Sequence, residues 1–388
     1  MKGLLSSGLV TLGVTAAAAL SLASCGAGKT QPSDVAGLDP TKFEAVVDGK
    51  PVALYSLRSS SGMEVAVTNY GGRIVALRVP DREGELRDVV LGFDSIQAYF
   101  PENNQTDFGA AIGRYANRIN KGLLPIDGDT IQLPTNNFGH CLHGGPTGWQ
   151  YQVYSAEQPN DSTLILTMDS PDGDNNFPGN VKATVTYTAL PGNKLDIAYS
   201  ATTDAPTVIN MTNHSYFNLS GNPANAVTDD ILYINASTFT PVDSTYMTTG
   251  EIIAVAGTPM DFSTPRRIGE AIDSTDYEQI RNGNGYDHNW VLDTKGNIEE
   301  PAVALCSPLS GITLSVYTDE PGVQVYSGNF LDGTVTGKGG ITYGQRTGIC
   351  LETQHYPDSP GKPQWPSTLL RPGETYNSHT IFSFSVTE

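Results

Sequence analysis

Two titratable side chains occur at the ends of strand-like runs, where they could face a functional site. Glu352 directly follows the apolar run Ile349-Cys350-Leu351. A carboxylate at the end of a buried strand loses hydration, which raises its pKa toward the range of a general base. His214 lies in TNHSYFNLSG at 212–221, the pattern of a strand and its exit. Taken singly, Glu352 could also be an exposed residue at a strand exit, and His214 a hydrogen-bonded core histidine.

Three further polar side chains occur in clusters that could face a ligand. His143 precedes two glycines in FGHCLHGG, and glycines allow a ligand to approach the backbone closely. Arg118 in GRYANRI could bind a sugar hydroxyl or form a structural ion pair. Asp287 in NGYDHNW could accept hydrogen bonds from hydroxyls or cap a turn. None of these residues selects one chemistry by itself, so each interpretation stays open at this point.

Charge and cysteine content exclude several functional classes. The chain of 388 residues has 22 Lys and Arg against 41 Asp and Glu, a formal net charge of -19. This charge repels polyanions, so we expect no nucleic-acid partner. Without Cys25, the cysteines Cys141, Cys306 and Cys350 form an odd, widely spaced set, which is not a disulfide framework. Neither C-x-x-C nor H-x-x-x-H occurs, so we expect no structural zinc site.

The amino-terminal 25 residues resemble a bacterial lipoprotein signal. Lys2 precedes an apolar run rich in small residues, which ends in Leu22-Ala23-Ser24-Cys25. An ordinary secretory signal or a single membrane anchor is the alternative interpretation. The pattern predicts lipidation of Cys25, a linker at 26–40 and a folded domain at 41–388. It also predicts a lipid-anchored protein of the bacterial cell envelope, periplasmic or on the outer membrane, with the lipid as its only membrane contact.

The body of the chain is a succession of strand-like runs. STLILTMDSPDG, VKATVTYTAL and KLDIAYSATT follow one another with alternating apolar and polar residues. Helical patterns are short, at 94–100 and 267–274. Strands do not alternate with long helices, and no short repeat is visible, which disfavours a parallel α/β sheet and a repeat array. We expect an all-β fold, one large antiparallel β-sandwich, with candidate site loops at 101–118, 134–150 and 276–290.

Eight motifs decide between the open interpretations, because together they resemble the aldose 1-epimerase (galactose mutarotase) family. Each motif is weak alone, but eight in the family's order are highly specific, and they span nearly the whole predicted domain. The motifs are NYGGRI (69–74), GRYANRI (113–119), LHGG (142–145), TNHSYFNLSG (212–221), YDHNW (286–290), GVQVYSGNF (322–330), LETQHYPDSP (351–360) and STLLRPGETY (367–376).

The resemblance implies a galactose mutarotase-like supersandwich that interconverts the α and β anomers of free aldohexoses such as galactose and glucose. It implies no cofactor and no metal. By motif, Glu352 would remove the proton of the C1 hydroxyl and His214 would protonate the ring oxygen. The ring would open, the C1–C2 bond would rotate, and the ring would close on the other face. The residues implied to bind the sugar are Asn117, Arg118, His143, Asp287, Gln324 and Tyr216.

Two alternatives and two departures accompany this resemblance. An isomerase of related fold acting on a phosphorylated sugar would need a cationic phosphate clamp. A sugar-binding lipoprotein that has lost catalysis would be expected to lack Glu352 or His214, and both are present. Cys141 and Trp365 depart from the family's usual residues, without touching the acid/base pair. The expected partner is a monosaccharide, and the expected assembly is a monomer or a weak dimer.

Overall fold

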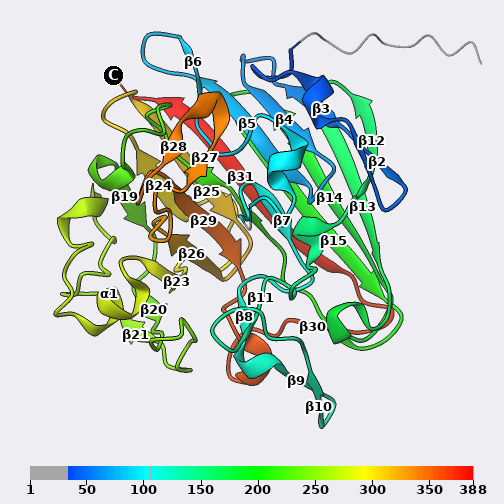
Figure 1. Ribbon diagram of the computed structural model, residues 1–388. Coiled ribbons are helices and arrows are strands. Elements are labelled where there is room, and N and C mark those ends of the chain that lie inside the picture. Colours follow the sequence, from blue (N-terminus) through cyan, green and yellow to red (C-terminus); the bar gives the residue numbers. More distant parts are fainter. Residues whose placement is uncertain (1–33, 105, 388) are drawn as a thin grey trace, which may run out of the picture. The chain divides into compact units, whose positions relative to one another are not determined.

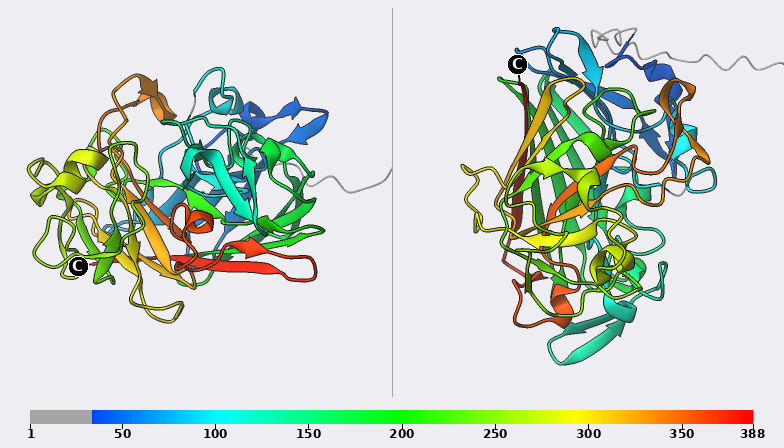
Figure 2. Two further views of the ribbon diagram at one scale, coloured as in Figure 1. Left: turned by 90° about the horizontal axis from the view of Figure 1, so that it is seen from below. Right: turned by 90° about the vertical axis from the view of Figure 1, so that its left-hand side faces the viewer.

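The computed structural model describes residues 34–104 and 106–387. Its largest sheet has nine strands, and every pairing within it is antiparallel (Figure 1). In spatial order the strands are β12 (Ser155–Asn160), β13 (Thr163–Ser170), β14 (Val181–Leu190), β15 (Lys194–Thr203), β31 (Tyr376–Val386), β25 (Ile312–Thr318), β24 (Val303–Cys306), β19 (Ile231–Ile234) and β22 (Arg266–Arg267). Figure 2 shows β31, in red, beside the green strands that precede it by almost 200 positions.

A second antiparallel sheet contains strands from four of the eight motifs. Its six strands, in spatial order, are β18 (Tyr216–Phe217), β29 (Ile349–Gln354), β26 (Gly322–Tyr326), β23 (Asp287–Val291), β20 (Thr238–Thr240) and β21 (Ile253–Ala254). Apolar side chains of both sheets form one core, with Leu195 and Phe382 from the first and Val323 and Leu351 from the second. The two sheets therefore face each other, as the alternation of apolar residues predicted for a β-sandwich.

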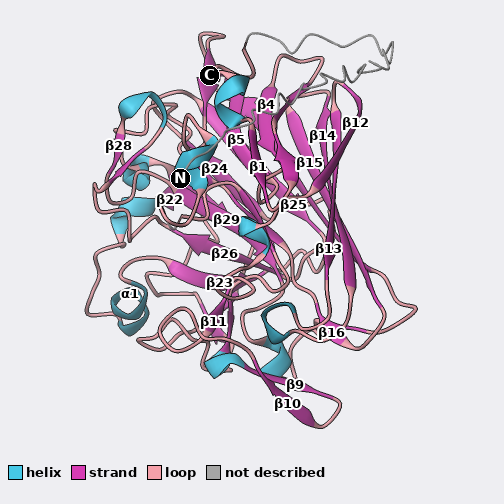
Figure 3. Cartoon of the chain, turned by 45° about the vertical axis from the view of Figure 1, so that its right-hand side comes forward, coloured by secondary structure: helices cyan, strands magenta, loops and turns pink. Residues whose placement is uncertain are grey.

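Smaller sheets and short helices complete the described part of the fold. A four-stranded sheet consists of β3 (Leu54–Arg58), β4 (Glu64–Thr68), β5 (Arg73–Pro80) and β6 (Leu86–Asp88). The two-stranded pairs are β1 (Ala45–Val47) with β2 (Lys50–Val52), β7 (Ala110–Ile112) with β17 (Thr212–His214), β8 (Arg118–Ile119) with β11 (Cys141–Leu142), β9 (Leu123–Ile126) with β10 (Asp129–Gln132), β16 (Thr207–Val208) with β30 (Leu369–Leu370), and β27 (Val335–Thr336) with β28 (Thr342–Tyr343). Figure 3 shows how far strands outweigh helices.

The helices are short, as the sequence indicated. The pattern at 94–100 becomes the 3-10 helix Ile96–Tyr99, and that at 267–274 becomes Ile268–Glu270. The α-helix α1 (Glu278–Gly283) was not predicted and lies in the expected loop 276–290. The other 3-10 helices of the described residues are Pro40–Phe43, Asn120–Gly122, Trp149–Tyr151, Asp174–Asn176, Val227–Asp229, Lys338–Gly340 and Ser359–Gly361. Within 34–104 and 106–387, no helix is long and apolar enough to cross a membrane.

The predictions for residues 1–40 fall partly outside and partly inside the described residues. The proposed signal, the lipidation at Cys25 and the first part of the linker lie in residues 1–33, outside the described residues. The rest of the linker differs from the expected tether, because Val35, Ala36 and Leu38 are buried in a core cluster with Phe43. Val35 and Leu38 also form an antiparallel bridge. Burying these apolar side chains is more favourable in free energy than leaving them in water, as a solvated tether would.

Candidate active site

One face of the six-stranded sheet supplies the floor of the site. Successive residues of a strand point to opposite faces, so Ile349 and Leu351 of β29 enter the core while Cys350 and Glu352 point the other way. Gln324 on β26 lies directly across from Glu352, and Tyr326 lies across from Cys350. Pairing across the strands thus gathers polar side chains on one patch, facing away from the main core.

His214 ends β17 and lies beside this floor. Its Nε2 is 3.6 Å from Oε1 of Glu352, and its Nδ1 is 3.5 Å from Sγ of Cys350. The ring stacks on Tyr216, with centroids 5.1 Å apart and planes inclined by 27°. The amide of Asn213 donates to the carbonyl of Gly109 and accepts from the backbone N–H of Ser215, and the hydroxyl of Ser215 has no hydrogen-bond partner within the protein. Contacts with Tyr216, Cys350 and Glu352 therefore hold the imidazole.

His143 follows β11 and faces His214, with ring centroids 5.2 Å apart. The backbone N–H of Asn117 donates to Nδ1 of His143 over 3.1 Å, and the N–H of His143 donates to the carbonyl of Asn117. Since Nδ1 accepts a hydrogen bond, the neutral imidazole carries its proton on Nε2. His143 is therefore held as a hydrogen-bond donor at Nε2.

Arg118 and Asp287 flank the acid/base pair. Nη2 of Arg118 donates to Oδ1 of Asn137 over 2.9 Å, and its guanidinium lies 5.2 Å from the ring centroid of Tyr246. Nε2 of Gln324 donates to Oδ1 of Asp287 over 2.7 Å, which fixes that carboxylate. Asp287 was expected on a loop, but it is the first residue of β23.

These side chains enclose a cavity of about 390 Å³. Seven of the eight residues predicted from the sequence line it, and Gln324 stands behind Asp287 without lining it. The volume lies in the range of small-molecule sites, about 300–1,000 Å³. Trp365, one of the two departures, packs on Tyr356 instead. The lining residues are Asp107, Asn117, Arg118, Asn137, Phe138, Leu142, His143, His214, Tyr216, Asp287, Tyr326, Phe330 and Glu352.

Burial shifts the acid/base groups toward their neutral forms. Burial raises the pKa of Glu352 well above its ordinary value, and the negative charges of Asp287 and Asp107 raise it further. Burial lowers the pKa of His214, which the charge of Asp107 opposes. Burial also lowers the pKa of His143 well below its usual value, and the nearby His214 and Arg118 add to this. Strongly shifted groups in one cleft are typical of a catalytic site.

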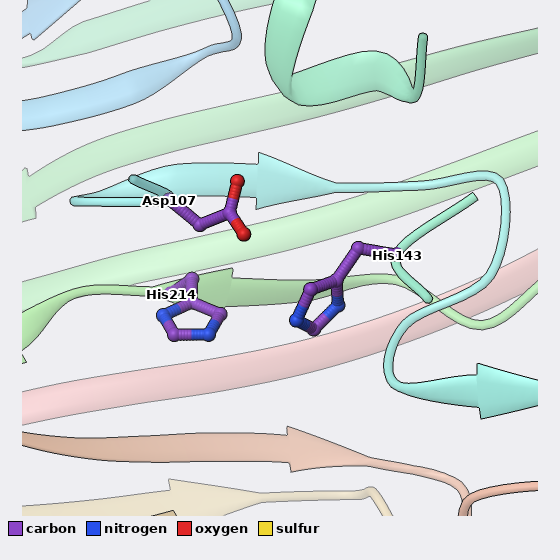
Figure 4. A group of neighbouring side chains, drawn as sticks. All are labelled: Asp107, His143 and His214. Atoms are coloured by element: carbon purple, nitrogen blue, oxygen red, sulfur yellow. The ribbon is translucent and has the colours of Figure 1, made fainter. Parts of the chain in front are cut away.

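Asp107 is the lining carboxylate that sequence reasoning missed. It lies just before β7, and one ligand atom from each of Asp107, His143 and His214 lies within 4.8 Å of the others (Figure 4). Its Oδ1 is buried and has no hydrogen-bond partner within the protein. The residue falls in the predicted site loop 101–118, but a single Asp in a polar loop carries no periodic signal.

The same three side chains have the proximity that a metal ion requires, but their hydrogen bonding does not suit one. His143 Nδ1 already accepts from the backbone of Asn117, and Nε2 carries the proton of the neutral ring. A metal at either nitrogen would have to displace that hydrogen bond or form an imidazolate. We therefore assign this group no metal and derive no metal-dependent step.

Comparisons with known proteins relate the chain to one family and one fold. The model of the aldose 1-epimerase family matches residues 53–383. The galactose mutarotases of mouse and human are 43% and 42% identical over 339 residues, covering 87% of this chain and 95% of each relative. A solved GalM/aldose epimerase homologue from C. elegans superposes with a TM-score of 0.80 at 30% identity, covering 87% of this chain and all of that one.

These relatives overturn one prediction. The expected lipid-anchored location in the bacterial cell envelope is wrong, because the chain aligns along most of its length with mutarotases of mouse and human, and neither is named as a lipid-anchored protein. The prediction rested on a short run of small apolar residues before Cys25, which lies outside the described residues.

The predicted family and the predicted fold are both confirmed. The family model spans most of the described chain, and the antiparallel fold superposes on that of a solved relative. The chain belongs to the aldose 1-epimerase family of isomerases.

Proposed function

We propose that this protein interconverts the α and β anomers of free aldohexoses such as galactose and glucose. The observation that carries the proposal is the separation of 3.6 Å between Glu352 Oε1 and His214 Nε2 on the floor of a cavity. Glu352 is 2% exposed, and its Oε2 has no partner within the protein. An anionic base and a protonated donor beside each other match the two adjacent oxygens of a cyclic hemiacetal.

In the proposed reaction Glu352 takes the proton of the C1 hydroxyl while His214 gives a proton to the ring oxygen. The C1–O5 bond breaks, and C1 becomes an aldehyde carbon. After rotation about C1–C2, the O5 hydroxyl attacks the other face of C1. His214 recovers the O5 proton, and Glu352 returns its proton to O1. The step is a balanced isomerisation, with each group ending as it began.

The pKa shifts suit this exchange. The reactive pair, Glu352 carboxylate with His214 imidazolium, holds one proton, and so does the neutral pair that forms on ring opening. Burial favours the neutral pair, because both charged forms lose hydration. Ring opening from the reactive pair therefore ends in the form that burial stabilises, and the same burial makes the reactive pair the rarer of the two forms before the sugar reacts. Each such acid or base typically contributes about 10²- to 10⁴-fold to the rate.

The remaining residues would bind and orient the sugar. His143 presents its Nε2–H to a hydroxyl, and Asn117 and Arg118 add further donors beside it. Asp287, held by Gln324, accepts from hydroxyls. Tyr216, which also lines the cavity, stacks on the His214 ring. Fixed donors and acceptors of this kind are what distinguish sugars that differ in one hydroxyl.

The charge of the site disfavours the phosphorylated sugar. Among the described lining residues, Arg118 is the one permanent cation, and the same lining includes the carboxyl groups of Asp107, Asp287 and Glu352. A phosphate dianion would meet more negative than positive charge there. A neutral sugar has no such cost, and its hydroxyls can donate to the carboxylates.

The test is polarimetry with freshly dissolved α-galactose and α-glucose. We expect the protein to accelerate the approach to anomeric equilibrium, and we expect no change with the methyl α-galactoside, whose O1 has no proton to lose. A rate equal to spontaneous mutarotation for every aldose offered would reject the function. Because one chain supplies every proposed site residue, we expect the monomer to be active, which sedimentation at assay concentration checks.

A further inference from the structure

Asp107 lines the cavity, but the proposed exchange of protons does not use it. Its Oδ1 is buried and has no hydrogen-bond partner among the described residues. Buried carboxylate oxygens are normally paired with donors, because an unpaired oxygen has lost its hydration without replacement. An acceptor left unpaired in the wall of a cavity marks a place where a bound molecule supplies the donor.

His214 belongs to two groups of closely spaced side chains. Glu352 and Cys350 form one group with it, and Asp107 and His143 form the other. Within each group, one ligand atom of every residue lies within 4.8 Å of the others. Figure 4 shows the carboxylate of Asp107 directed toward the two imidazole rings. Asp107 precedes β7 and Glu352 is on β29, so His214 is the neighbour that these two carboxyl groups share.

The order of these three side chains matches the order of three oxygens in a pyranose. The ring oxygen O5 is bonded to C1, which carries O1, and to C5, whose hydroxymethyl group carries O6. In the proposed reaction Glu352 acts on O1 and His214 acts on O5. The other exocyclic oxygen close to O5 is O6, and the other carboxyl group close to His214 is that of Asp107.

We propose that Asp107 binds the O6 hydroxyl and thereby selects hexoses that keep an unmodified hydroxymethyl group. This inference rests on the proposed function. The O6 hydroxyl donates to Oδ1 of Asp107, the acceptor that is otherwise unpaired. The same oxygen accepts from His143, whose proton is fixed on Nε2 by the hydrogen bond from the backbone of Asn117.

Three classes of aldose cannot make this contact. A 6-deoxyhexose places a methyl group beside Oδ1 of Asp107, and a pentose places no carbon there, so both leave the carboxylate without its donor. A uronic acid places a second carboxylate at the same point, and like charges repel. A site built to hydrogen-bond a hydroxyl rejects an analogue that lacks it, because the polar group of the protein is then left unpaired.

The experiment measures kcat/KM by polarimetry for galactose and 6-deoxygalactose, and in parallel for glucose and xylose. We expect the wild type to prefer galactose over 6-deoxygalactose by about 10- to 100-fold, the range for a hydrogen bond to a charged group. In Asp107→Ala the preference should fall below about twofold, because no acceptor remains. Asp107→Asn keeps an acceptor oxygen without the charge, so it should retain a preference of about 3- to 10-fold.

The ratio of the two sugars separates this contact from the effect of the Asp107 charge on the acid/base pair. That charge raises the pKa of Glu352 and His214 whichever sugar is bound, so its removal changes both rates alike at one pH. Asp287→Ala is the matched control, because Asp287 also lines the cavity and its charge also raises the pKa of Glu352. We expect this control to lower both rates and to leave their ratio unchanged.

The outcomes distinguish this inference from the proposed function. Equal acceleration of galactose and 6-deoxygalactose by the wild type overturns the contact between Asp107 and O6 and leaves the function standing. A preference that persists in Asp107→Ala overturns the contact as well, because another group then determines it. A preference that also disappears in Asp287→Ala overturns it too, because charge alone then explains the ratio. Failure to accelerate any aldose rejects the function itself.

A second measurement covers the case in which Asp107→Ala does not fold. Asp107→Asn is nearly identical in shape to the wild type and removes only the charge that opposes a uronic acid. We expect its kcat/KM for galacturonate, relative to that for galactose, to rise at least about tenfold over the wild-type ratio. An unchanged ratio would show that C6 does not lie beside Asp107, and the inference would be rejected.

Discussion

The two facing sheets divide stability and chemistry between them. In the nine-stranded sheet, β14 and β15 alternate between buried and more exposed positions along almost their whole length. In the six-stranded sheet, every residue of β26 and β29 is buried. The first sheet has one face in the core and the other toward solvent. The second has one face in the core and the other under the cavity and its loops.

This difference explains where the polar residues can act. On β14 and β15 the outward positions are hydrated, so a carboxylate or imidazole there would keep a pKa close to its ordinary value. On β29 the outward position of Glu352 is buried, and burial raises the pKa of that carboxylate. Polar groups buried without full hydrogen bonding cost free energy, so the polar face of the six-stranded sheet lowers the stability of the fold. The nine-stranded sheet must supply the stability that compensates for this loss.

The largest expected effect comes from Glu352→Gln. The amide keeps the shape of the side chain but cannot take a proton, so we expect kcat to fall by at least about 10²- to 10⁴-fold. We also expect the thermal midpoint to stay equal or rise, because a buried ionisable group is removed. Polarimetry of α-galactose and a calorimetric scan measure the two quantities.

Glu320→Gln is the matched control for this variant. Glu320 is also buried, but it bonds to Nδ1 of His355 over 2.6 Å and accepts from the hydroxyl of Tyr376, and it does not line the cavity. We expect it to lose stability and to keep its rate. An undiminished rate in Glu352→Gln, or equal losses of rate in both variants, would contradict the assignment of the catalytic chemistry to the polar face of the six-stranded sheet.

A core truncation in the nine-stranded sheet should have the converse effect, lowering stability and leaving the rate unchanged. Ile197 of β15 is fully buried, and Ile197→Ala should lower the free energy of unfolding by about 2–5 kcal/mol, through lost burial and the remaining cavity. The fraction that remains folded should keep the kcat of the wild type. Urea unfolding and polarimetry on the same preparation test this pair of expectations. A fall in kcat of the folded protein would show that the first sheet shapes the site.

Sequence reasoning succeeded where side chains follow a period or a motif. The alternation in 181–190 and 194–203 predicted β14 and β15, and the motifs predicted Glu352 and His214 with six further residues, of which the structure gathers all eight at one cavity or directly behind it. Period two along β29 would also have placed Cys350 on the face of Glu352, although its apolar neighbours suggested the core. Asp107, Phe138 and Phe330 lie in irregular segments, where only the folded backbone determines what they face.

A smaller effect should follow from Asp107→Asn. The charge of Asp107 raises the pKa of both Glu352 and His214, so its removal should lower both. The pair is active while it holds one proton, and its two limbs are properties of the pair. We therefore expect the whole pH profile of kcat/KM to move to lower pH. Asp107→Glu should restore the position of the profile. A uniform loss of rate with unmoved limbs would indicate that Asp107 only supports the loop.

The smallest effect should come from a histidine in the other sheet. His379 of β31 bonds to Asp196 of β15, and this hydrogen bond raises the pKa of His379, whereas burial lowers that of His214. A histidine with a raised folded-state pKa stabilises the fold fully below its unfolded value, near 6.5, and loses this contribution as pH rises through the folded value.

Asp196→Asn should therefore lower the free energy of unfolding at pH 5.5 more than at pH 9. The pair is partly exposed, so we expect less than about 1 kcal/mol. Urea unfolding at the two pH values measures the difference, and mutarotation at neutral pH should not change. A larger loss at pH 9 would reverse the assigned sign. The pKa of a histidine is thus shifted in opposite directions at the two places, because His379 on the nine-stranded sheet bonds to a carboxylate near the surface, whereas His214 beside the six-stranded sheet has lost its hydration.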